Sequence, residues 1–343
     1  MTRSLLLALL LALASSGCSE PQPVHHNRFL AFGTLVDLDI SGVSQQAAEQ
    51  ATAAIQADFD YMHHAWHAWD PGPLGYVNRM IRTGEPFAVP PSVLPLIEIG
   101  QRLSQQSEQL FDPAIGQLIE LWGFHRKKEP PQPPDETTIQ ALLDARPSIT
   151  DLKLNGITLQ SDNPQVKLDF GAFGKGYGID LAIDHLRQLG IRNAIVNAGG
   201  DLRAIGNHGD RPWRIAIRDP SGEGVFAVIE IDNDESVFTS GDYERNFVYQ
   251  GRRYHHIIDP RNGYPATGSR SVTVIHTDAT TADAAATALF IAGPRDWYRI
   301  ARSMRLKYVL LVDDLGELHM SPAMAQRIEL TNPNLQIQLS EAL

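Results

Sequence analysis

The order of strand-like and helix-like patterns along the chain limits the folds that it can adopt. Residues 36–40 alternate between apolar and acidic side chains, as in a half-buried strand, and apolar residues recur every three to four positions over 47–66, as in an amphipathic helix. Several strand-like runs follow one another between residues 194 and 249, and helical patterns over 279–292 and 297–304 come later. Because strands and helices do not alternate regularly, the sequence predicts an α+β fold and not a doubly wound parallel sheet.

The composition is that of an ordinary globular protein. Apolar residues make up 43% of the 343 residues and charged residues 20%, which is enough apolar material for a sizeable core. The formal net charge of −11 argues against a nucleic-acid-binding protein, because binding to phosphates requires clustered Lys and Arg. The single cysteine, Cys18, excludes an intramolecular disulfide, a cysteine-based zinc site and an iron–sulfur cluster.

The N-terminal segment has the features of a bacterial export signal. Residues 1–17 combine a short positive start with an apolar run over 5–14 that is too short to span a bilayer, and small residues directly precede Cys18. This junction resembles a lipobox, in which the cysteine becomes the lipidated first residue of the mature protein. We therefore expect a signal peptide over 1–17, a lipidated tether over 18–28 and a single domain over 29–343. Cleavage and secretion without a lipid is the alternative.

A glycine-rich loop lies between a predicted strand and a predicted helix. The segment 169–178 reads DFGAFGKGYG, with four glycines in its last eight positions. Such a loop lets the backbone approach a ligand closely, and the N-terminus of the following helix favours phosphate. Its spacing matches neither the dinucleotide-binding GxGxxG motif nor the P-loop. The alternative is a turn that packs a helix against a sheet.

Two oxygen-bearing side chains lie one turn apart in the predicted helix over 279–292. Asp283 and Thr287 have the i, i+4 spacing that places both on one face of the helix. Oxygen ligands of this kind suit a hard cation such as Mg²⁺. The alternative role for an aspartate near the start of a helix is an N-terminal cap.

Two histidine-containing patterns complete the set of candidate sites. In the run HHIIDPRNGYP, Asp259 follows His256 by three positions, so a general base could lie beside a carboxylate; the alternative is a polar turn that closes a hairpin. His63 and His67 have the i, i+4 spacing of a metal-binding pair, but they lack the glutamate of HExxH and an obvious third ligand. We therefore favour a solvated or packing role for this pair.

A series of short segments occurs in a fixed order between residues 31 and 293. They are AFGT from Ala31, LFDPAIG from Leu110, LWGF from Leu121, DFGAFGKGY from Asp169, NAGGD from Asn197, TSGDYER from Thr239, HIIDP from His256 and ADAAAT from Ala282. Each segment is short, but the ordered set resembles the ApbE family of FAD:protein FMN transferases. The chain departs from the family pattern at Phe32, where Met is frequent, and at Asn262, where Thr is usual.

The resemblance implies an activity, a fold and a set of partners. Family members bind FAD with Mg²⁺ at its pyrophosphate. A Ser or Thr hydroxyl of a target protein attacks the FMN-side phosphorus, so AMP leaves and FMN stays on the target. The implied fold has mixed β-sheets flanked by helices, with the nucleotide in a cleft between them. The implied target is a membrane or periplasmic redox subunit, which agrees with a protein anchored by lipid on the periplasmic side of the bacterial cell envelope.

The resemblance also assigns roles to individual residues. The metal ligands would be the backbone oxygen of Ala172 together with Asp283 and Thr287. The base or orienting group would be His256, with Asp259 beside it. The implied flavin and nucleotide contacts are Phe32, Leu110, Phe111, Asp112, Asp169, Lys175 and Ile257.

Two other functions stay open on the sequence. With water as the acceptor, the same site would make the protein an FAD pyrophosphatase that releases FMN and AMP. A non-catalytic flavin-binding or assembly lipoprotein would instead bind FAD without releasing AMP. The pair Asp283 and Thr287 favours an enzyme, because a binding module has less need of a metal at the phosphates.

Overall fold

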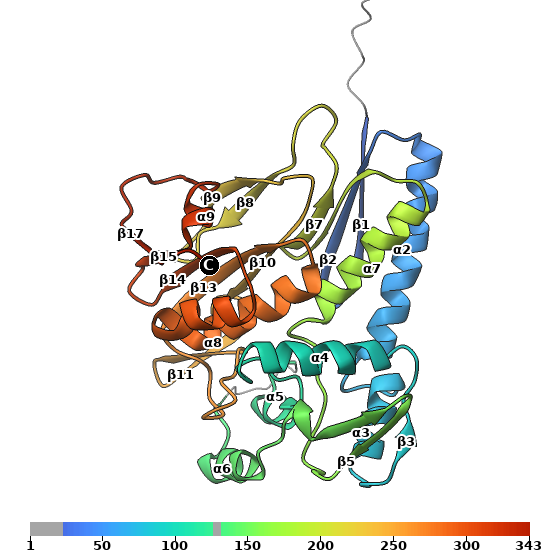
Figure 1. The fold of residues 1–343 in the computed structure, drawn as a ribbon, viewed down its shortest axis with the longest axis vertical. Coiled ribbons are helices and arrows are strands. Elements are labelled where there is room, and N and C mark those ends of the chain that lie inside the picture. Colours follow the sequence, from blue (N-terminus) through green and yellow to red (C-terminus); the bar gives the residue numbers. More distant parts are fainter. Residues whose placement is uncertain (1–22, 126–131) are drawn as a thin grey trace, which may run out of the picture.

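The computed structural model describes residues 23–125 and 132–343, so the predicted signal peptide and Cys18 lie outside the described residues. A nine-stranded sheet forms the centre of the molecule (Figure 1), with strand order β1-β2-β6-β7-β10-β13-β14-β15-β17. Neighbouring strands are antiparallel except for the last pair, β15 and β17. The strands are β1 (Val24–Ala31), β2 (Thr34–Ser41), β6 (Asn193–Ala198), β7 (Asp201–Ile205), β10 (Asp234–Gly241), β13 (Ser269–His276), β14 (Tyr308–Asp313), β15 (Leu318–Met320) and β17 (Ile337–Leu339).

Apolar side chains project from both faces of this sheet. On one face, Val272 and Val274 of β13 belong to the main core, which three long helices cover (Figure 1). On the other face, Ile275 belongs to a second core shared with a smaller sheet of order β16-β9-β8. Because successive strand residues point to opposite faces, a strand that contributes to both cores has adjacent buried apolar residues, as β14 has over 309–312. The helices are α2 (Gln45–Trp66), α7 (Gly174–Gln188) and α8 (Ala279–Ser303), and the smaller sheet consists of β8 (Arg214–Arg218), β9 (Val225–Glu230) and β16 (Glu329–Leu330).

A second group of elements lies beyond α8 from the central sheet, in the lower part of Figure 1. The indole Nε1 of Trp122 donates a hydrogen bond to the carbonyl of Gly263 at 2.8 Å, which joins this group to the turn after His256. The elements are α3 (Pro73–Ile81), β3 (Phe87–Ala88), α4 (Leu94–Gln106), α5 (Gly116–Trp122), α6 (Glu136–Ala145), η1 (Ile149–Asp151), β4 (Leu152–Asn155) and β5 (Thr158–Ser161). The remaining elements are the hairpin of β11 (Asn246–Tyr249) and β12 (Arg252–His255) and the short helix α9 (Pro322–Ala325).

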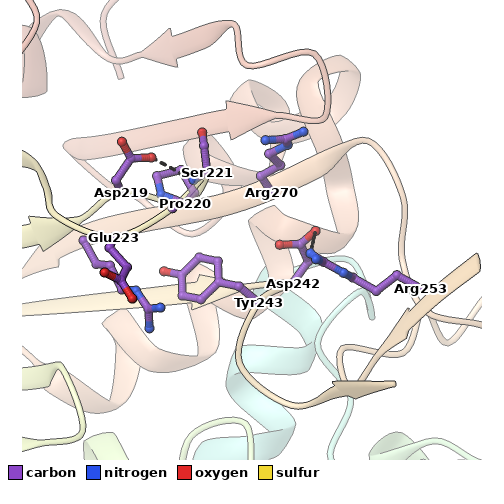
Figure 2. Close-up of a pocket in the computed structure, with 10 residues that line it drawn as sticks. Asp219, Pro220, Ser221, Glu223, Asp242, Tyr243, Arg253 and Arg270 are labelled. Atoms are coloured by element: carbon purple, nitrogen blue, oxygen red, sulfur yellow. Dashed lines mark hydrogen bonds and ion pairs between the residues drawn. The ribbon is translucent and has the colours of Figure 1, made fainter. Parts of the chain in front are cut away.

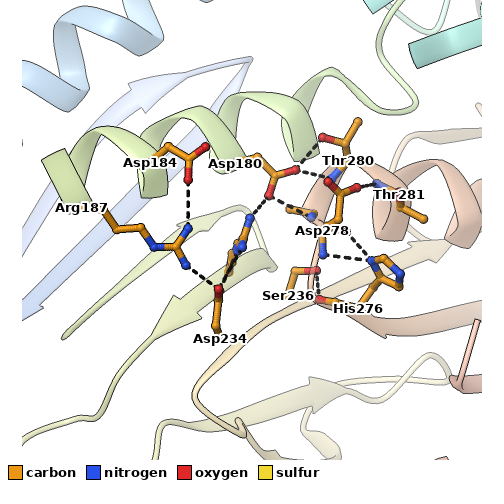
Figure 3. A network of polar contacts seen from close by, with 11 residues as sticks. Asp180, Asp184, Arg187, Asp234, Ser236, His276, Asp278, Thr280 and Thr281 are labelled. Atoms are coloured by element: carbon orange, nitrogen blue, oxygen red, sulfur yellow. Dashed lines mark hydrogen bonds and ion pairs between the residues drawn. The ribbon is translucent and has the colours of Figure 1, made fainter. Parts of the chain in front are cut away.

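A buried carboxylate on α7 holds the first turn of α8. Asp180 accepts hydrogen bonds from the backbone N–H groups of Ala279 and Thr280 at 2.9 and 2.8 Å, and from the Thr280 hydroxyl at 2.6 Å. Arg203 of β7 forms an ion pair with the same carboxylate and also with Asp234 (Figure 3). These contacts satisfy amides that a helix start leaves without intrahelical partners, and they fix α8 against α7.

The structure confirms the α+β fold and corrects one expected boundary. Strand β1 begins at Val24, so residues 24–28 of the expected tether are part of the sheet, where Arg28 pairs with Asp37 at 2.5 Å. The two helical patterns over 279–292 and 297–304 form α8, which is interrupted at Gly293 with φ 69° and ψ −177°. No helix within residues 23–125 and 132–343 combines the length and apolar character needed to cross a bilayer.

Candidate functional site

The first turns of α7 and α8 meet at Gly176. The Gly176 N–H donates a hydrogen bond to Asp283 Oδ2 at 2.9 Å, so each helix supplies a carboxylate to the first turn of the other. A Cβ atom on Gly176 would lie 2.9 Å from Asp283 Cβ and closer still to the carbonyl oxygen of Ala279. The glycine-rich loop therefore packs one helix against another, and the absent side chain is what permits this approach.

Asp283 and Thr287 lie on one face of α8, as the i, i+4 spacing predicts. Asp283 is not the N-cap of the helix, because Asp278 holds that position and accepts a hydrogen bond from the Thr281 N–H at 2.7 Å. Burial raises the pKa of Asp283 to about 8, although the neighbouring Lys175 opposes this shift. The Thr287 hydroxyl lies 3.3 Å from the Ser240 hydroxyl, within hydrogen-bonding distance. A buried carboxylate with little compensation is a frequent feature of functional sites.

Lys175 is positioned beside this pair by Asp201. The two side chains form an ion pair, and Asp201 also accepts a hydrogen bond from the Thr239 N–H at 3.0 Å. Burial opposes the charge on Lys175, but the carboxylates of Asp201 and Asp283 outweigh it and hold the pKa of Lys175 above its usual value. Asp201 ends the NAGGD segment, whose spacing alone did not indicate a role for this carboxylate.

His256 is held by its backbone, and one of its two ring nitrogens, Nδ1, is buried without a partner among the described residues. Its N–H donates a hydrogen bond to the carbonyl of Arg245 at 3.0 Å. Its Nδ1 is buried and makes no hydrogen bond to any described residue. Burial, followed by the charge of Arg245, places the pKa of His256 well below 6.5. The imidazole is therefore neutral at neutral pH and can accept a proton.

The Asp259 carboxylate is paired with Arg261 in this structure. It accepts hydrogen bonds from the Arg261 side chain at 2.7 to 3.1 Å and from the Arg261 N–H at 2.9 Å. The Asp259 carbonyl accepts from the Gly263 N–H at 2.8 Å. Asp259 thus stabilises the turn at 259–264, which is the polar-turn alternative, and its carboxylate is occupied by Arg261.

Several expected flavin contacts are core residues in this structure. The side chains of Leu110, Phe111 and Ile257 are buried, and the Phe111 ring packs edge-on against Phe173 with centroids 5.3 Å apart. The Asp112 carboxylate is used within the fold. It accepts hydrogen bonds from the N–H groups of Ala114 and Ile149 and from the Ser148 hydroxyl.

Phe32 and Asp169 remain partly accessible at the edge of the glycine-rich loop. Phe32 has a positive φ of 50°, and its ring stacks on Trp66 with centroids 6.0 Å apart. That ring also lies 2.9 Å from where a Cβ on Gly178 would be, so Phe32 contacts α7. Asp169 accepts a hydrogen bond from the Gly171 N–H at 3.1 Å. Burial raises the pKa of Asp169 against the opposing charge of Arg245.

The oxygen atoms around α7 and α8 fit a hard cation. Asp283 and Thr287 offer side-chain oxygens, and the carbonyl of Ala172, just before α7, accepts no hydrogen bond within the described ranges. Oxygen donors in this mixture of carboxylate, hydroxyl and carbonyl are what Mg²⁺ prefers.

Two other groups of possible metal ligands are explained by local structure. Asp313, Glu317 and His319 lie close together, but Asp313 accepts hydrogen bonds from the N–H groups of Leu315 and Glu317 and from His319, which closes the β14–β15 hairpin. The rings of His63 and His67 lie 5.4 Å apart on and just after α2. Within 23–125 and 132–343, no third His, Cys, Asp or Glu lies close enough to complete a metal site with this pair.

A polar cleft of about 550 Å³ opens next to the segment 239–245 (Figure 2). The guanidinium of Arg218 lies over the Tyr243 ring, 5.1 Å from its centroid, and Arg253 lies 3.6 Å from Asp242. Burial, followed by the charge of Glu244, raises the pKa of Tyr243 to about 12. The TSGDYER segment thus connects this cleft with Ser240 at the oxygen cluster and with Arg245 beside His256.

Comparison with known proteins adds independent information. The model of the ApbE family matches residues 32–310. An FAD:protein FMN transferase of Rhodobacter capsulatus is 42% identical over 94% of this chain, which spans 62% of that longer protein. An FAD:protein FMN transferase of Vibrio cholerae is 32% identical, over 90% of this chain and 94% of its own length.

Solved structures give the same result. The ApbE protein from Thermotoga maritima superposes with a TM-score of 0.82 and 32% identity, covering 89% of this chain and 99% of its own. The flavin transferase ApbE from Vibrio cholerae superposes with a TM-score of 0.79 and 29% identity, covering 90% and 100%.

Replacing Gly176 by alanine tests the close approach of the two helices. We expect Gly176→Ala to lower the free energy of unfolding by about 1–3 kcal/mol, because the new methyl group has no space beside Ala279 and Asp283. Urea unfolding measures the change. The matched control is Gly174→Ala in the same loop, where a Cβ would make an ordinary 3.5 Å contact and stability should not fall. Equal stability of the two variants would contradict the packing described here.

Proposed function

Because this chain belongs to the ApbE family, we propose that it transfers FMN from FAD to a Ser or Thr hydroxyl of an acceptor protein and releases AMP. The observation that carries this proposal is the set of oxygen donors just before α7 and on one face of the N-terminal half of α8, with Lys175 and the neutral His256 nearby. The names of the relatives support the transfer of FMN, and the geometry supports chemistry at a diphosphate.

The residues that would hold Mg²⁺ are Asp283, Thr287 and the carbonyl of Ala172. When bound, Mg²⁺ supplies positive charge to the phosphate oxygens. Lys175 contributes a further positive charge on the same side, fixed in place by Asp201. Gly176 keeps the Asp283 carboxylate in position through its N–H group, so this side chain does not have to reorganise during the reaction.

The transfer step replaces the phosphoanhydride bond of FAD with a phosphoester bond to the acceptor. The acceptor hydroxyl oxygen forms a bond to the FMN-side phosphorus, and the bond from this phosphorus to the bridging oxygen breaks, so that AMP leaves with that oxygen. The proton of the hydroxyl passes to His256, which its low pKa keeps unprotonated at neutral pH. Asp259 is paired with Arg261 in this structure, so the proposal assigns the proton to His256 alone.

Substitution of Asp283 tests the proposed metal site. We expect Asp283→Ala to reduce FMN transfer at least about 100-fold, the usual size of effect when a group that stabilises developing charge is lost. The measurement is mass spectrometry of an acceptor protein incubated with FAD and Mg²⁺, with AMP followed in parallel. The matched control is Asp296→Asn, an acidic residue of α8 that pairs with Arg299 away from the cluster.

The products of the same experiment separate the candidate functions. AMP together with an FMN adduct supports transfer. AMP and free FMN without an adduct, across several acceptors, would identify an FAD pyrophosphatase. Normal transfer by Asp283→Ala would show that this carboxylate is not needed for the reaction and would contradict the proposed metal site.

The pH dependence of the transfer tests the role of His256. A base must be deprotonated, so activity should fall only as the pH drops through the pKa of His256, which lies well below 6.5. At saturating Mg²⁺, which would hold Asp283 in its charged form, we therefore expect the rate to stay level from pH 8 down to about 6.5 and to decline below that. In His256→Gln we expect the rate to be lower and this acid-side decline to be absent. An unchanged profile in His256→Gln would assign the decline to another group.

We further propose that the protein is anchored by a lipid on Cys18 at the periplasmic side of the bacterial cell envelope. The apolar run over 5–14 and the small residues before Cys18 support this proposal. We expect Cys18→Ser to move the protein from the membrane fraction to the soluble fraction, with its FMN transfer rate unchanged. Recovery of wild-type protein in the soluble fraction would instead indicate secretion without a lipid.

A further inference from the structure

The segment that follows β10 connects the oxygen cluster with His256. Ser240, near the end of β10, lies 3.3 Å from the Thr287 hydroxyl through its own hydroxyl group. Five residues later, the carbonyl of Arg245 accepts the hydrogen bond from the His256 N–H at 3.0 Å. The backbone of Arg245 is therefore fixed between the proposed metal ligands and the proposed base, just before β11 begins at Asn246.

The guanidinium of Arg245 is available to a ligand. The side chain is exposed, and no hydrogen bond or ion pair joins it to another residue within 23–125 and 132–343. Lys175, the other cation near His256, is already paired with Asp201. Arg245 is thus the positive charge at this site that the fold itself leaves uncompensated.

The charge of Arg245 acts on both sides of the site. It lowers the pKa of Asp169 against the effect of burial, and it lowers the pKa of His256 together with burial, His255 and Lys175. Arg245 therefore lies within electrostatic reach of an expected FAD contact and of the proposed base. A planar guanidinium also matches two phosphate oxygens at once, which an ammonium group does not.

We propose that Arg245 binds the diphosphate of FAD and stabilises the phosphoryl group under attack, as a cationic contact separate from Asp283, Thr287 and Lys175. This inference rests on the proposed transfer of FMN. Negative charge increases on the phosphoryl oxygens as the bond to the leaving AMP breaks, and a preorganised cation stabilises that charge without reorganisation. The same charge disfavours protonation of His256 and so keeps this ring in its unprotonated form before the acceptor binds.

The kinetic test compares Arg245→Gln and Arg245→Lys with the wild-type chain. We expect Arg245→Gln to lower kcat/KM for FAD about 100-fold, as for the loss of one charged contact to a reacting oxyanion. Arg245→Lys should recover part of this loss, because lysine keeps the charge without the planar fork. The control is Arg295→Gln, which removes the same charge from an exposed position on α8 and should match the wild type.

Two further measurements distinguish a direct contact from a structural effect. Calorimetry with inorganic pyrophosphate in EDTA should show weaker binding to Arg245→Gln than to the wild type and to Arg295→Gln. The acid-side decline of the rate should move to higher pH in Arg245→Gln, because loss of the positive charge raises the pKa of His256. If Arg245→Gln melts at a lower temperature than the wild type, Arg245→Met, which keeps the aliphatic stem, replaces it in all three comparisons.

The outcomes separate this inference from the proposed function. Wild-type values of kcat/KM and of pyrophosphate affinity in Arg245→Gln, with an FMN adduct formed, would overturn the role of Arg245 and leave the transfer intact. The opposite result has two parts: the wild-type protein forms no adduct, and Arg245→Gln binds pyrophosphate more weakly than the wild type. This result would overturn the transfer and leave the assignment of Arg245 intact.

Discussion

The first turns of α7 and α8 approach so closely that a Cβ atom has no room at Gly176, and two buried carboxylates hold them together. Asp180 on α7 accepts hydrogen bonds from the first amides of α8, and Asp283 on α8 accepts one from the first turn of α7. Each helix therefore caps the other, and the positive ends of both helix dipoles lie at one place. The two helix N-termini together therefore stabilise negative charge next to the site.

The buried carboxylates of Asp180 and Asp283 differ in the groups that compensate their negative charge. Asp180 has two backbone amides, a hydroxyl and the ion pair with Arg203, so all of its oxygens are engaged (Figure 3). Asp283 has one backbone amide and the nearby Lys175, whose charge Asp201 shares. This difference explains why Asp180 serves the fold, whereas Asp283 is suited to a cation. Both carry a raised pKa because burial disfavours their charged forms.

The sequence predicted those features that depend on local spacing. Alternation and helical periodicity indicated α+β, and the i, i+4 spacing placed Asp283 and Thr287 on one face of α8. Spacing could not show that Asp278, and not Asp283, caps that helix, nor that Arg261 occupies the carboxylate of Asp259. The partners Asp201, Ser240 and Arg245 come from other strands and turns, so only the tertiary fold brings them to the site. The family resemblance indicated which segments form the site. It did not indicate which side chains of those segments are engaged in contacts within the fold.

If Cys18 carries the proposed lipid, the early start of β1 limits where this protein can work. Five residues, 19–23, separate Cys18 from the first strand at Val24. A chain of that length spans at most roughly 20 Å when fully extended. With a lipid on Cys18, the folded domain would stay close to the bilayer surface and could not move far from it. An acceptor hydroxyl would then have to be presented within a thin layer next to the membrane, so distance from the bilayer would select targets before any contact with the site.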